Sequence, residues 1–313
     1  MEAGAWLITG EFDEVQRVID RAAEHPDPWV RASALFGRAF SAEYDGDPGT
    51  AEQHMRTAAD AFRELGDRWG LAQTVSSLAG FRSLRGDHAG AVDVLTESLE
   101  SFRQLRSEAD LVPTLLRIGA ERLRAGDLDG GHADLEQARS IADRTRPWFT
   151  IWALNGLAEH ARLSGRLDAA ENFLDDADRI PVDEHENSVI QPVLLLQRAR
   201  VLLDRGRTAD VPVLLAKALE GGFGIRDVPT AAVVAECAAR WRLRTDDPRG
   251  AARLHGLAVA LRGVLDEGDP DVRRVRAALR KSDDHAAAFD TGAAQDRSAA
   301  FAELRSTLNS SSA

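Results

Sequence analysis

A short turn recurs along most of this 313-residue chain at a nearly constant interval, and it constrains the fold more than any other feature. The turn begins at Gly10, Gly46, Gly86, Gly126, Gly165 and Gly206, at intervals of 36, 40, 40, 39 and 41 residues, and the segment DDPRG places Asp246 at the next equivalent position. Such a period is the signature of a repeat protein, in which each unit packs only against its neighbours. The chain is therefore predicted to form one quasi-linear array, although its length alone suggests about two domains.

The residues around each turn predict a helical hairpin. Seven residues before the turn and twelve residues after it, every repeat carries Ala, Gly or Ser, which lets two helices approach closely. Nine residues after the turn stands a large apolar side chain, except in the last repeat, which has His255. Trp29, Trp69 and Trp148 each stand seventeen residues before a turn, so a repeated structural role is predicted for them. Each unit is thus expected to be a helix, a tight turn and a second helix.

The hydrophobic pattern has the 3.6-residue period of a helix, and alternation with a period of two is hard to find. Met55, Ala58, Phe62 and Leu65, for example, fall on one helical face. We predict an all-α, helical-hairpin solenoid of about seven hairpins followed by capping helices. Residues 1–265 are expected to form the array, with a first repeat truncated at the N-terminus, residues 266–308 the C-terminal capping helices, and residues 309–313 a disordered tail.

The small–Gly–small–apolar–small skeleton resembles the tetratricopeptide repeat, whose hairpins stack into a right-handed superhelix. Residues 62–105 (FRELGDRWGLAQ and onward) are similar to the long repeats of large bacterial transcriptional regulators. Residues 247–265, DPRGAARLHGLAVALRGVL, are similar to the last helical pair in that group. Those regulators join a signalling ATPase of the NB-ARC or MalT type, a tetratricopeptide array and a LuxR-like DNA-binding domain. The resemblance implies that the first helix of each hairpin lines a concave, partner-binding groove.

The sequence carries neither of the other two modules of those regulators. No GxxxxGK[ST] loop is present to cradle a phosphate, and neither end has a basic helix-turn-helix segment. Acidic residues number 51 against 39 Lys and Arg, a net charge of −12 that argues against direct binding to nucleic acid or to an anionic membrane. No apolar run approaches about 18 residues and the acidic N-terminus has no signal-peptide core, so a cytoplasmic protein is predicted.

No catalytic or metal-binding constellation is recognisable. Asp183, Glu184, His185 and Glu186 are adjacent, but ligands adjacent in sequence rarely converge on one ion, so a solvated acidic loop is predicted. Cys237 is the only cysteine in the sequence, has apolar neighbours and is predicted to be packed in the core. We therefore expect a protein that is not an enzyme and that uses no cofactor or metal.

The candidate binding residues lie on the first helices of the repeats, where the resemblance places the concave face. Trp152, Asn155, Glu159 and Arg162 are spaced i, i+3, i+7 and i+10, so they form one stripe with an aromatic anchor and alternating charge. The alternative is an ordinary solvated helix face with Trp152 packed into the next repeat. The other candidates are Arg117, Gln197 and Arg200, and the equivalent positions elsewhere hold Phe36, Phe40, Glu43, Arg124 and Arg240.

These features predict a non-enzymatic scaffold that binds a protein, a peptide or a small-molecule inducer along its concave face. The leading hypothesis is the sensor or interaction region of a bacterial transcriptional regulator whose ATPase and DNA-binding modules are absent from this chain. The alternative is a free-standing tetratricopeptide adaptor that mediates protein–protein assembly.

Overall fold

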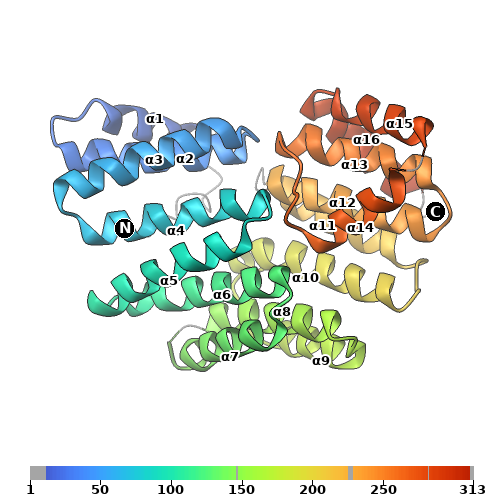
Figure 1. The fold of residues 1–313 in the computed structure, drawn as a ribbon, viewed down its shortest axis with the longest axis horizontal. Helices are drawn as coiled ribbons and strands as arrows, with labels where there is room; N and C mark the ends of the chain where they lie inside the picture. The colour runs from blue at the N-terminus through green and yellow to red at the C-terminus, as the bar shows by residue number, and fades with distance from the viewer. Residues whose placement is uncertain (1–11, 146, 225–227, 281, 311–313) are drawn as a thin grey trace.

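The computed structural model describes residues 12–145, 147–224, 228–280 and 282–310, which form sixteen α-helices and no strand within these ranges (Figure 1). The helices are α1 (Phe12–Ala23), α2 (Pro28–Tyr44), α3 (Pro48–Leu65), α4 (Arg68–Leu84), α5 (His88–Gln104), α6 (Glu108–Ala125), α7 (Leu128–Thr145), α8 (Pro147–Leu163), α9 (Leu167–Asp178), α10 (Glu184–Asp204), α11 (Val211–Gly224), α12 (Val228–Arg244), α13 (Pro248–Arg262), α14 (Pro270–Leu279), α15 (Asp283–Ala293) and α16 (Arg297–Ser310).

Consecutive helices pack as hairpins, in the pairs α2–α3, α4–α5, α6–α7, α8–α9, α10–α11 and α12–α13. Helix α1 precedes these six hairpins as the second helix of a further repeat, and α14–α16 follow them. The expected all-α, tetratricopeptide-like helical-hairpin solenoid is thus confirmed. The turn at Gly10 and the helix expected before it lie outside the described residues.

Each described hairpin turns at a residue with left-handed backbone geometry. The turn residues Gly46, Gly86, Gly126, Gly165 and Gly206 have φ between +65° and +91°, a region in which glycine is free of the Cβ clash. Asp246, which replaces glycine in the last turn, has the same geometry with φ of 62°. After Gly46, Gly86 and Gly126 an aspartate caps the second helix, as where the Asp47 carboxylate accepts the Thr50 N–H at 3.1 Å, whereas an arginine follows Gly165 and Gly206.

The small residues of the repeat lie where neighbouring helices meet. The alanines seven residues before the turn, among them Ala39, Ala79 and Ala158, are at most 1% exposed. The large apolar residues nine after the turn, such as Met55 and Leu95, are equally buried. Small side chains bring the helix axes together and the larger ones fill the space toward the next hairpin, so the core is built as a series of clusters along the array.

The repeated tryptophans join successive hairpins. The indole Nε1 of Trp29 donates to the Asp67 carboxylate at 2.7 Å, and that of Trp69 donates to the Asp110 carboxylate at 2.8 Å. Both acceptors lie at the start of the first helix of the next repeat. Trp148 differs, because its ring packs edge-on against Trp152 at a centroid distance of 5.8 Å. The predicted repeated role therefore holds for two of the three tryptophans.

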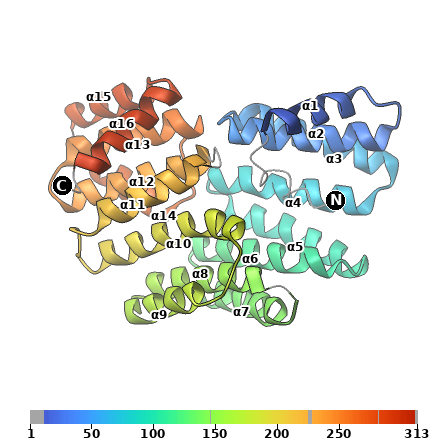
Figure 2. The same ribbon diagram turned by 180° about the vertical axis from the view of Figure 1, so that it is seen from behind.

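The array curves until its two ends approach each other (Figures 1 and 2). Helices α1–α4 form one arm, α11–α16 form the other, and α5–α10 connect them on the far side. Two hydrogen bonds link the arms directly: Arg297 Nη2 donates to the Gly46 carbonyl at 2.9 Å, and the Glu267 N–H donates to the Leu84 carbonyl at 2.8 Å. The curvature therefore creates a concave interior lined by the first helices of the repeats.

The three helices that follow the last hairpin, α14, α15 and α16, lie at two places on the array. Helices α15 and α16 pack on α13 and α11 and cover the end of the array, whereas α14 begins on the concave face. Helix α16 includes Asn309 and Ser310, which were expected in the disordered tail; residues 311–313 lie outside the described residues. In the described part of the chain, no helix combines the length and the apolar character needed to cross a membrane.

Candidate binding site on the concave face

A row of arginines runs along the concave face, one from the first helix of each of four successive repeats. Arg124 lies on α6, Arg162 on α8, Arg200 on α10 and Arg240 on α12, at sequence intervals of 38, 38 and 40 residues. Because the intervals match the repeat period, the stacking of the hairpins brings the four guanidinium groups into one neighbourhood. We call these four residues the arginine face.

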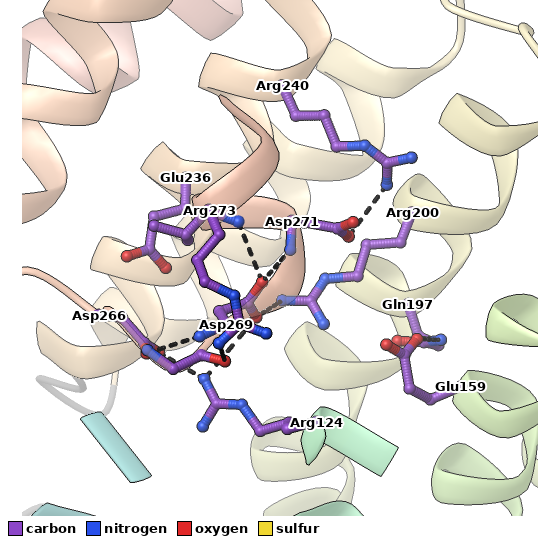
Figure 3. Close-up of polar contacts among 12 residues, drawn as sticks. Arg124, Glu159, Gln197, Arg200, Glu236, Arg240, Asp266, Asp269, Asp271 and Arg273 are labelled. Carbon is purple, nitrogen blue, oxygen red and sulfur yellow. Dashed lines mark hydrogen bonds and ion pairs between the residues drawn. The ribbon is translucent and has the colours of Figure 1, made fainter. Parts of the chain in front are cut away.

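An acidic segment of the same chain lies on the arginine face (Figure 3). This segment, Asp266-Glu267-Gly268-Asp269-Pro270-Asp271, links α13 to α14 and is called the acidic clasp below. Its three aspartates are at most 8% exposed. Asp266 Oδ1 accepts the N–H groups of Gly268 and Asp269 at 2.9 Å, and Asp269 caps α14 by accepting the Asp271 N–H at 2.7 Å. Local hydrogen bonds thus hold the clasp in a tight turn with its carboxylates facing the arginines.

Each arginine of the face contacts a carboxylate of the clasp. Arg124 Nη2 lies 2.6 Å from Asp266 Oδ2, and Arg200 Nη2 lies 3.3 Å from Asp269 Oδ2. Asp271 Oδ2 lies 3.1 Å from Arg240 Nη1 and 3.2 Å from Arg162 Nη2. Charge-assisted hydrogen bonds of this kind are the strong ones in a buried environment.

The pKa values of the buried acids reflect these contacts. Burial alone raises the pKa of Asp269, but Arg200, Arg124 and the two N–H groups at the start of α14 outweigh burial and hold it well below its ordinary value. Glu159, which is partly buried, has its pKa lowered to about 2, because the hydrogen bonds and charge of Arg162 exceed the cost of desolvation. Both carboxylates are therefore ionised near neutral pH, and the concave face is a network of opposite charges.

The clasp also touches the opposite arm. Besides the bond from the Glu267 N–H to Leu84, the Gly268 carbonyl lies 3.0 Å from His88 Nε2, while His88 Nδ1 lies 2.8 Å from Glu121 Oε2. A Cβ at Gly268 would lie 1.9 Å from the Ser83 carbonyl oxygen, so only glycine permits this approach of backbone to backbone. The clasp therefore bridges the arm built by α4 and the arm built by α12 and α13.

A cavity of about 500 Å³ adjoins the clasp inside the concave face. Arg117, Asn155, Gln197 and Arg200 line it together with the carboxylates of Glu43 and Glu121. The volume falls in the range of about 300–1,000 Å³ that is usual for ligand pockets. Four of the residues that the sequence singled out as binding candidates thus meet at one site, although they come from α6, α8 and α10.

Arg117 stands out among the arginines of the concave interior. Its Nη1 donates to Ser76 Oγ at 3.0 Å, just as Arg124 Nη1 donates to Ser83 Oγ at 2.6 Å, and both pairs are 41 residues apart. Arg124 has a clasp carboxylate as well, whereas among the described residues no carboxylate lies within 4.0 Å of Arg117. Burial lowers the pKa of Arg117, and the charges of Glu43 and Glu121 offset this only in part.

Asn155 is the second unusual group of the cavity. Its Oδ1 is buried and has no hydrogen-bond partner among the residues that the structure describes. A buried polar atom without a partner costs free energy comparable to a lost hydrogen bond, which makes such atoms uncommon in folded proteins. The cavity therefore combines a weakly compensated cation with an unsatisfied amide oxygen.

Several of the predicted residues, Gln197 of the cavity lining among them, are engaged within the chain. Arg162 and Gln197 are only 4% exposed, and both are bonded within the chain, since each donates to the Glu159 carboxylate. Trp152 is partly buried against the core between α8 and α10, which is the alternative that was left open for it. The stripe of Trp152, Asn155, Glu159 and Arg162 is thus mostly structural, and only Asn155 lines the cavity.

The acidic clasp is the part of the site that sequence reasoning missed. Its sequence, DEGDPD, indicates only a turn-rich break before a capping helix. In the sequence, only the arginine that recurs in four repeats points to the position of the clasp. Such a recurrence indicates that the four arginines share an anionic partner.

A second hollow of about 570 Å³ lies between α1, α2 and α4. It is lined mainly by apolar side chains, including Val18, Trp29 and Trp69 and the expected concave residues Phe36 and Phe40. Phe36 and Phe40 also pack edge-on against each other at 4.9 Å. These two phenylalanines therefore belong to an apolar groove at the first arm, separate from the charged interior.

Two features that the sequence analysis examined for metal binding or catalysis, the acidic segment at Asp183 and Glu186 and the cysteine Cys237, have structural roles. Asp183 caps α10 in a reciprocal pair with Glu186. Cys237 is buried as predicted, and burial raises the pKa of its thiol to about 11. Across the described ranges, no three His, Cys, Asp or Glu side chains are grouped in a way that could hold a metal ion. His132 and His160, from different repeats, do meet, with ring centroids 4.6 Å apart.

Comparison with known proteins gives limited further information. No protein-family model matches the chain, and none of the curated sequences matches it. Among solved structures, the crystal structure of yeast Tom70 is similar, with a TM-score of 0.49 and 14% sequence identity over 90% of this chain. The chain spans 64% of the length of that structure.

Proposed function

We propose that this protein is a non-enzymatic scaffold that binds a segment of a partner protein in the concave cavity beside the acidic clasp. The observation that carries the proposal is Arg117, which lines the cavity, is partly buried and, among the described residues, has only the Ser76 hydroxyl as its hydrogen-bond partner. Arg124 is bonded to a serine hydroxyl and to the Asp266 carboxylate. A carboxylate of the partner would give Arg117 the same two kinds of contact.

The second polar group of the cavity supports a peptide as the ligand. Asn155 Oδ1 needs a donor, and the amide N–H of a peptide backbone supplies one. A peptide segment with an acidic side chain therefore satisfies both groups at once. An inorganic anion would satisfy Arg117 but would leave Asn155 without a partner.

The test is capture of a partner by the tagged protein from cells of its own source, with the wild type compared with the Arg117→Ala variant. Arg56→Ala is the matched control, because Arg56 lies on α3 with its side chain 65% exposed and is paired only with Glu52. We expect a partner that binds the wild type and the control but not Arg117→Ala. A partner protein that binds equally to the wild type, Arg117→Ala and Arg56→Ala would show that the cavity is not the protein-binding site. A small molecule retained by all three proteins would show the same.

The cellular context that we propose is the cytoplasm of a bacterium, where the scaffold serves as the sensor region of a transcriptional regulator of the signalling-ATPase class. The support is the similarity of residues 62–105 and 247–265 to the repeats of those regulators. The check is the DNA adjoining the coding sequence, which should encode an ATPase with a phosphate-binding loop and a DNA-binding domain. Without such modules, a free-standing adaptor is the role that remains.

A further inference from the structure

We propose that the arginine face is itself a binding surface for an acidic partner segment, and that the acidic clasp is an internal competitor that occupies it until such a segment displaces it. This inference rests on the proposed function, because it names the chemistry of the partner. It concerns different side chains of the same concave interior: Arg124 and Arg200, which the clasp covers, rather than Arg117, which the clasp does not contact.

The clasp is held by polar contacts rather than by a hydrophobic core. Its six residues are Asp, Glu, Gly and Pro, and none carries a large apolar side chain. The apolar anchors of α14 come later, at Val272, Val275 and Leu279, and the last two belong to the core shared by α12 and α13. Residues 266–271 can therefore leave the arginine face while α14 stays attached through its second half.

Two of the four arginines depend on the clasp. Arg162 also pairs with Glu159 and Asp204, and Arg240 also pairs with Asp204, so both keep a carboxylate when the clasp leaves. Arg124 and Arg200 have ion-pair partners only in the clasp, among the residues that the structure describes. The side chains of Arg124 and Arg200 are only 24% and 20% exposed, so leaving both without an anion is costly and release of the clasp requires another anionic occupant.

An exchange of one carboxylate segment for another avoids that cost. Desolvation of the arginines and the attraction of a carboxylate are the same for a clasp aspartate and for a partner aspartate, so the two states are close in free energy. The clasp has the advantage of being tethered, which gives it an effective concentration on the order of millimolar. The partner's apparent affinity is therefore its intrinsic affinity multiplied by the fraction of molecules in which the clasp is released.

The contacts of the clasp define the kind of partner that fits. Asp266 and Asp269 are three residues apart and meet arginines from α6 and α10, so a partner needs two carboxylates at a similar spacing. The clasp backbone also donates to the Leu84 carbonyl and accepts from His88, which places main-chain groups of the ligand against α4 and α5. An aspartate-rich segment of a protein meets both requirements, whereas a single small anion supplies neither the second carboxylate nor the main-chain groups.

The experiment uses a fluorescein-labelled peptide with the sequence of residues 263–274, GVLDEGDPDVRR. Its binding is measured by fluorescence anisotropy to the full-length wild type and to the double variant Asp266→Asn/Asp269→Asn. Asparagine caps helices as well as aspartate does, so the turn is retained while the charges are removed. The matched control is Asp175→Asn/Asp178→Asn, which removes two carboxylates from an ion pair with Arg198 elsewhere.

We expect the clasp variant to bind the peptide at least tenfold more tightly than the wild type and the control bind it. The same peptide with asparagine at all three aspartate positions should bind at least tenfold more weakly, and adding Arg124→Gln/Arg200→Gln to the clasp variant should abolish binding. Equal affinity for the wild type and the clasp variant, or no binding to either, would overturn the proposal.

If the clasp variant does not fold, hydrogen exchange in the wild type decides the question. The amide of Glu267, bonded to the opposite arm, should exchange faster in about 0.5–1 M salt, while the amide of Val275 within α14 should not. Equal salt sensitivity of the two amides would overturn the proposal. Capture of a natural partner by the Arg117→Ala variant tests the cavity separately. The failure of one proposal can therefore be distinguished from the failure of the other.

Discussion

Arg124 Nη2 on α6 lies 2.6 Å from Asp266 Oδ2 in the acidic clasp, although the two residues are 142 positions apart in the chain. The contact joins the middle of a repeat array to the segment that follows its last hairpin. In an array that was held only by neighbouring units, such a contact would be absent. The stability of the segment after the last hairpin therefore depends on a side chain in the middle of the array.

Replacing Arg124 with Gln should lower the free energy of unfolding by about 3 kcal/mol, because it leaves Asp266 buried without its cation. Chemical unfolding followed by circular dichroism measures the change. Arg179→Gln is the control: Arg179 pairs with Asp176 in a contact whose side chains are 72% and 52% exposed, so the change should stay within about 0.5 kcal/mol. A similar effect for both variants would contradict the structural role of the clasp contact.

The tryptophan link between repeats predicts an asymmetry between two conservative substitutions. Trp69→Phe removes the hydrogen bond to Asp110 and should cost about 1–2 kcal/mol beyond the loss of ring area. Trp148→Phe removes no such bond, since its indole nitrogen has no hydrogen-bond partner among the described residues. Thermal unfolding of the two variants should therefore differ, and equal destabilisation would show that the indole bond contributes nothing.

Two glycines inside helices predict opposite effects of alanine. At Gly256 on α13, an added Cβ would lie 2.2 Å from the Phe289 carbonyl oxygen on α15, so Gly256→Ala must separate these helices and should cost about 2 kcal/mol or more. At Gly80 on α4 nothing lies within 4 Å of the added Cβ, so Gly80→Ala should stabilise the protein by about 0.5–1 kcal/mol. Denaturant midpoints test the pair, and a stabilising Gly256→Ala would refute the close crossing of α13 and α15.

His255 predicts a loss of stability in mild acid. Burial, with smaller contributions from Arg276 and Arg262, lowers its pKa to about 4, against about 6.5 in the unfolded chain. Above pH 6.5 both states are neutral and His255 has no effect on the pH dependence. Between pH 6.5 and 4 the unfolded chain takes up the proton first, so stability should fall by about 3 kcal/mol.

The control for this pH dependence is His255→Leu, because leucine or another large apolar residue stands at this position in the other repeats. The variant should lose the part of the pH dependence between pH 6.5 and 4 that His255 causes. Parallel stability curves for the wild type and the variant over this range would show that His255 does not titrate as proposed.

The hairpins could be predicted from the sequence because each depends on local residues. The repeat interval predicts a turn at Asp246 although no glycine stands there, and the left-handed backbone of Asp246 confirms this turn. Leu65 marks the limit of periodicity: the helical period places it on an apolar face, yet it is 39% exposed, because it is the last residue of α3 before Gly66 turns the chain.

The acidic clasp could not be predicted in the same way. DEGDPD has no periodicity, and its partners lie far away in sequence, as Arg200 does at 69 residues from Asp269. Which residues of a concave face are free depends on what covers them, and a covering segment of this kind obeys no repeat rule. Arg162, for example, is a candidate binding residue by its position in the repeat, and the Asp271 carboxylate of the clasp lies 3.2 Å from its Nη2.

The central claim is that an acidic segment displaces the clasp, and an environment-sensitive fluorophore attached through the substitution Glu267→Cys tests it most directly. The Glu267 side chain is 55% exposed, whereas Cys237 is buried with a raised thiol pKa, so labelling of the introduced thiol should be selective. Addition of the unlabelled 263–274 peptide should change the emission saturably, and salt should weaken the effect. Peptide binding that leaves the emission at this position unchanged would contradict the claim.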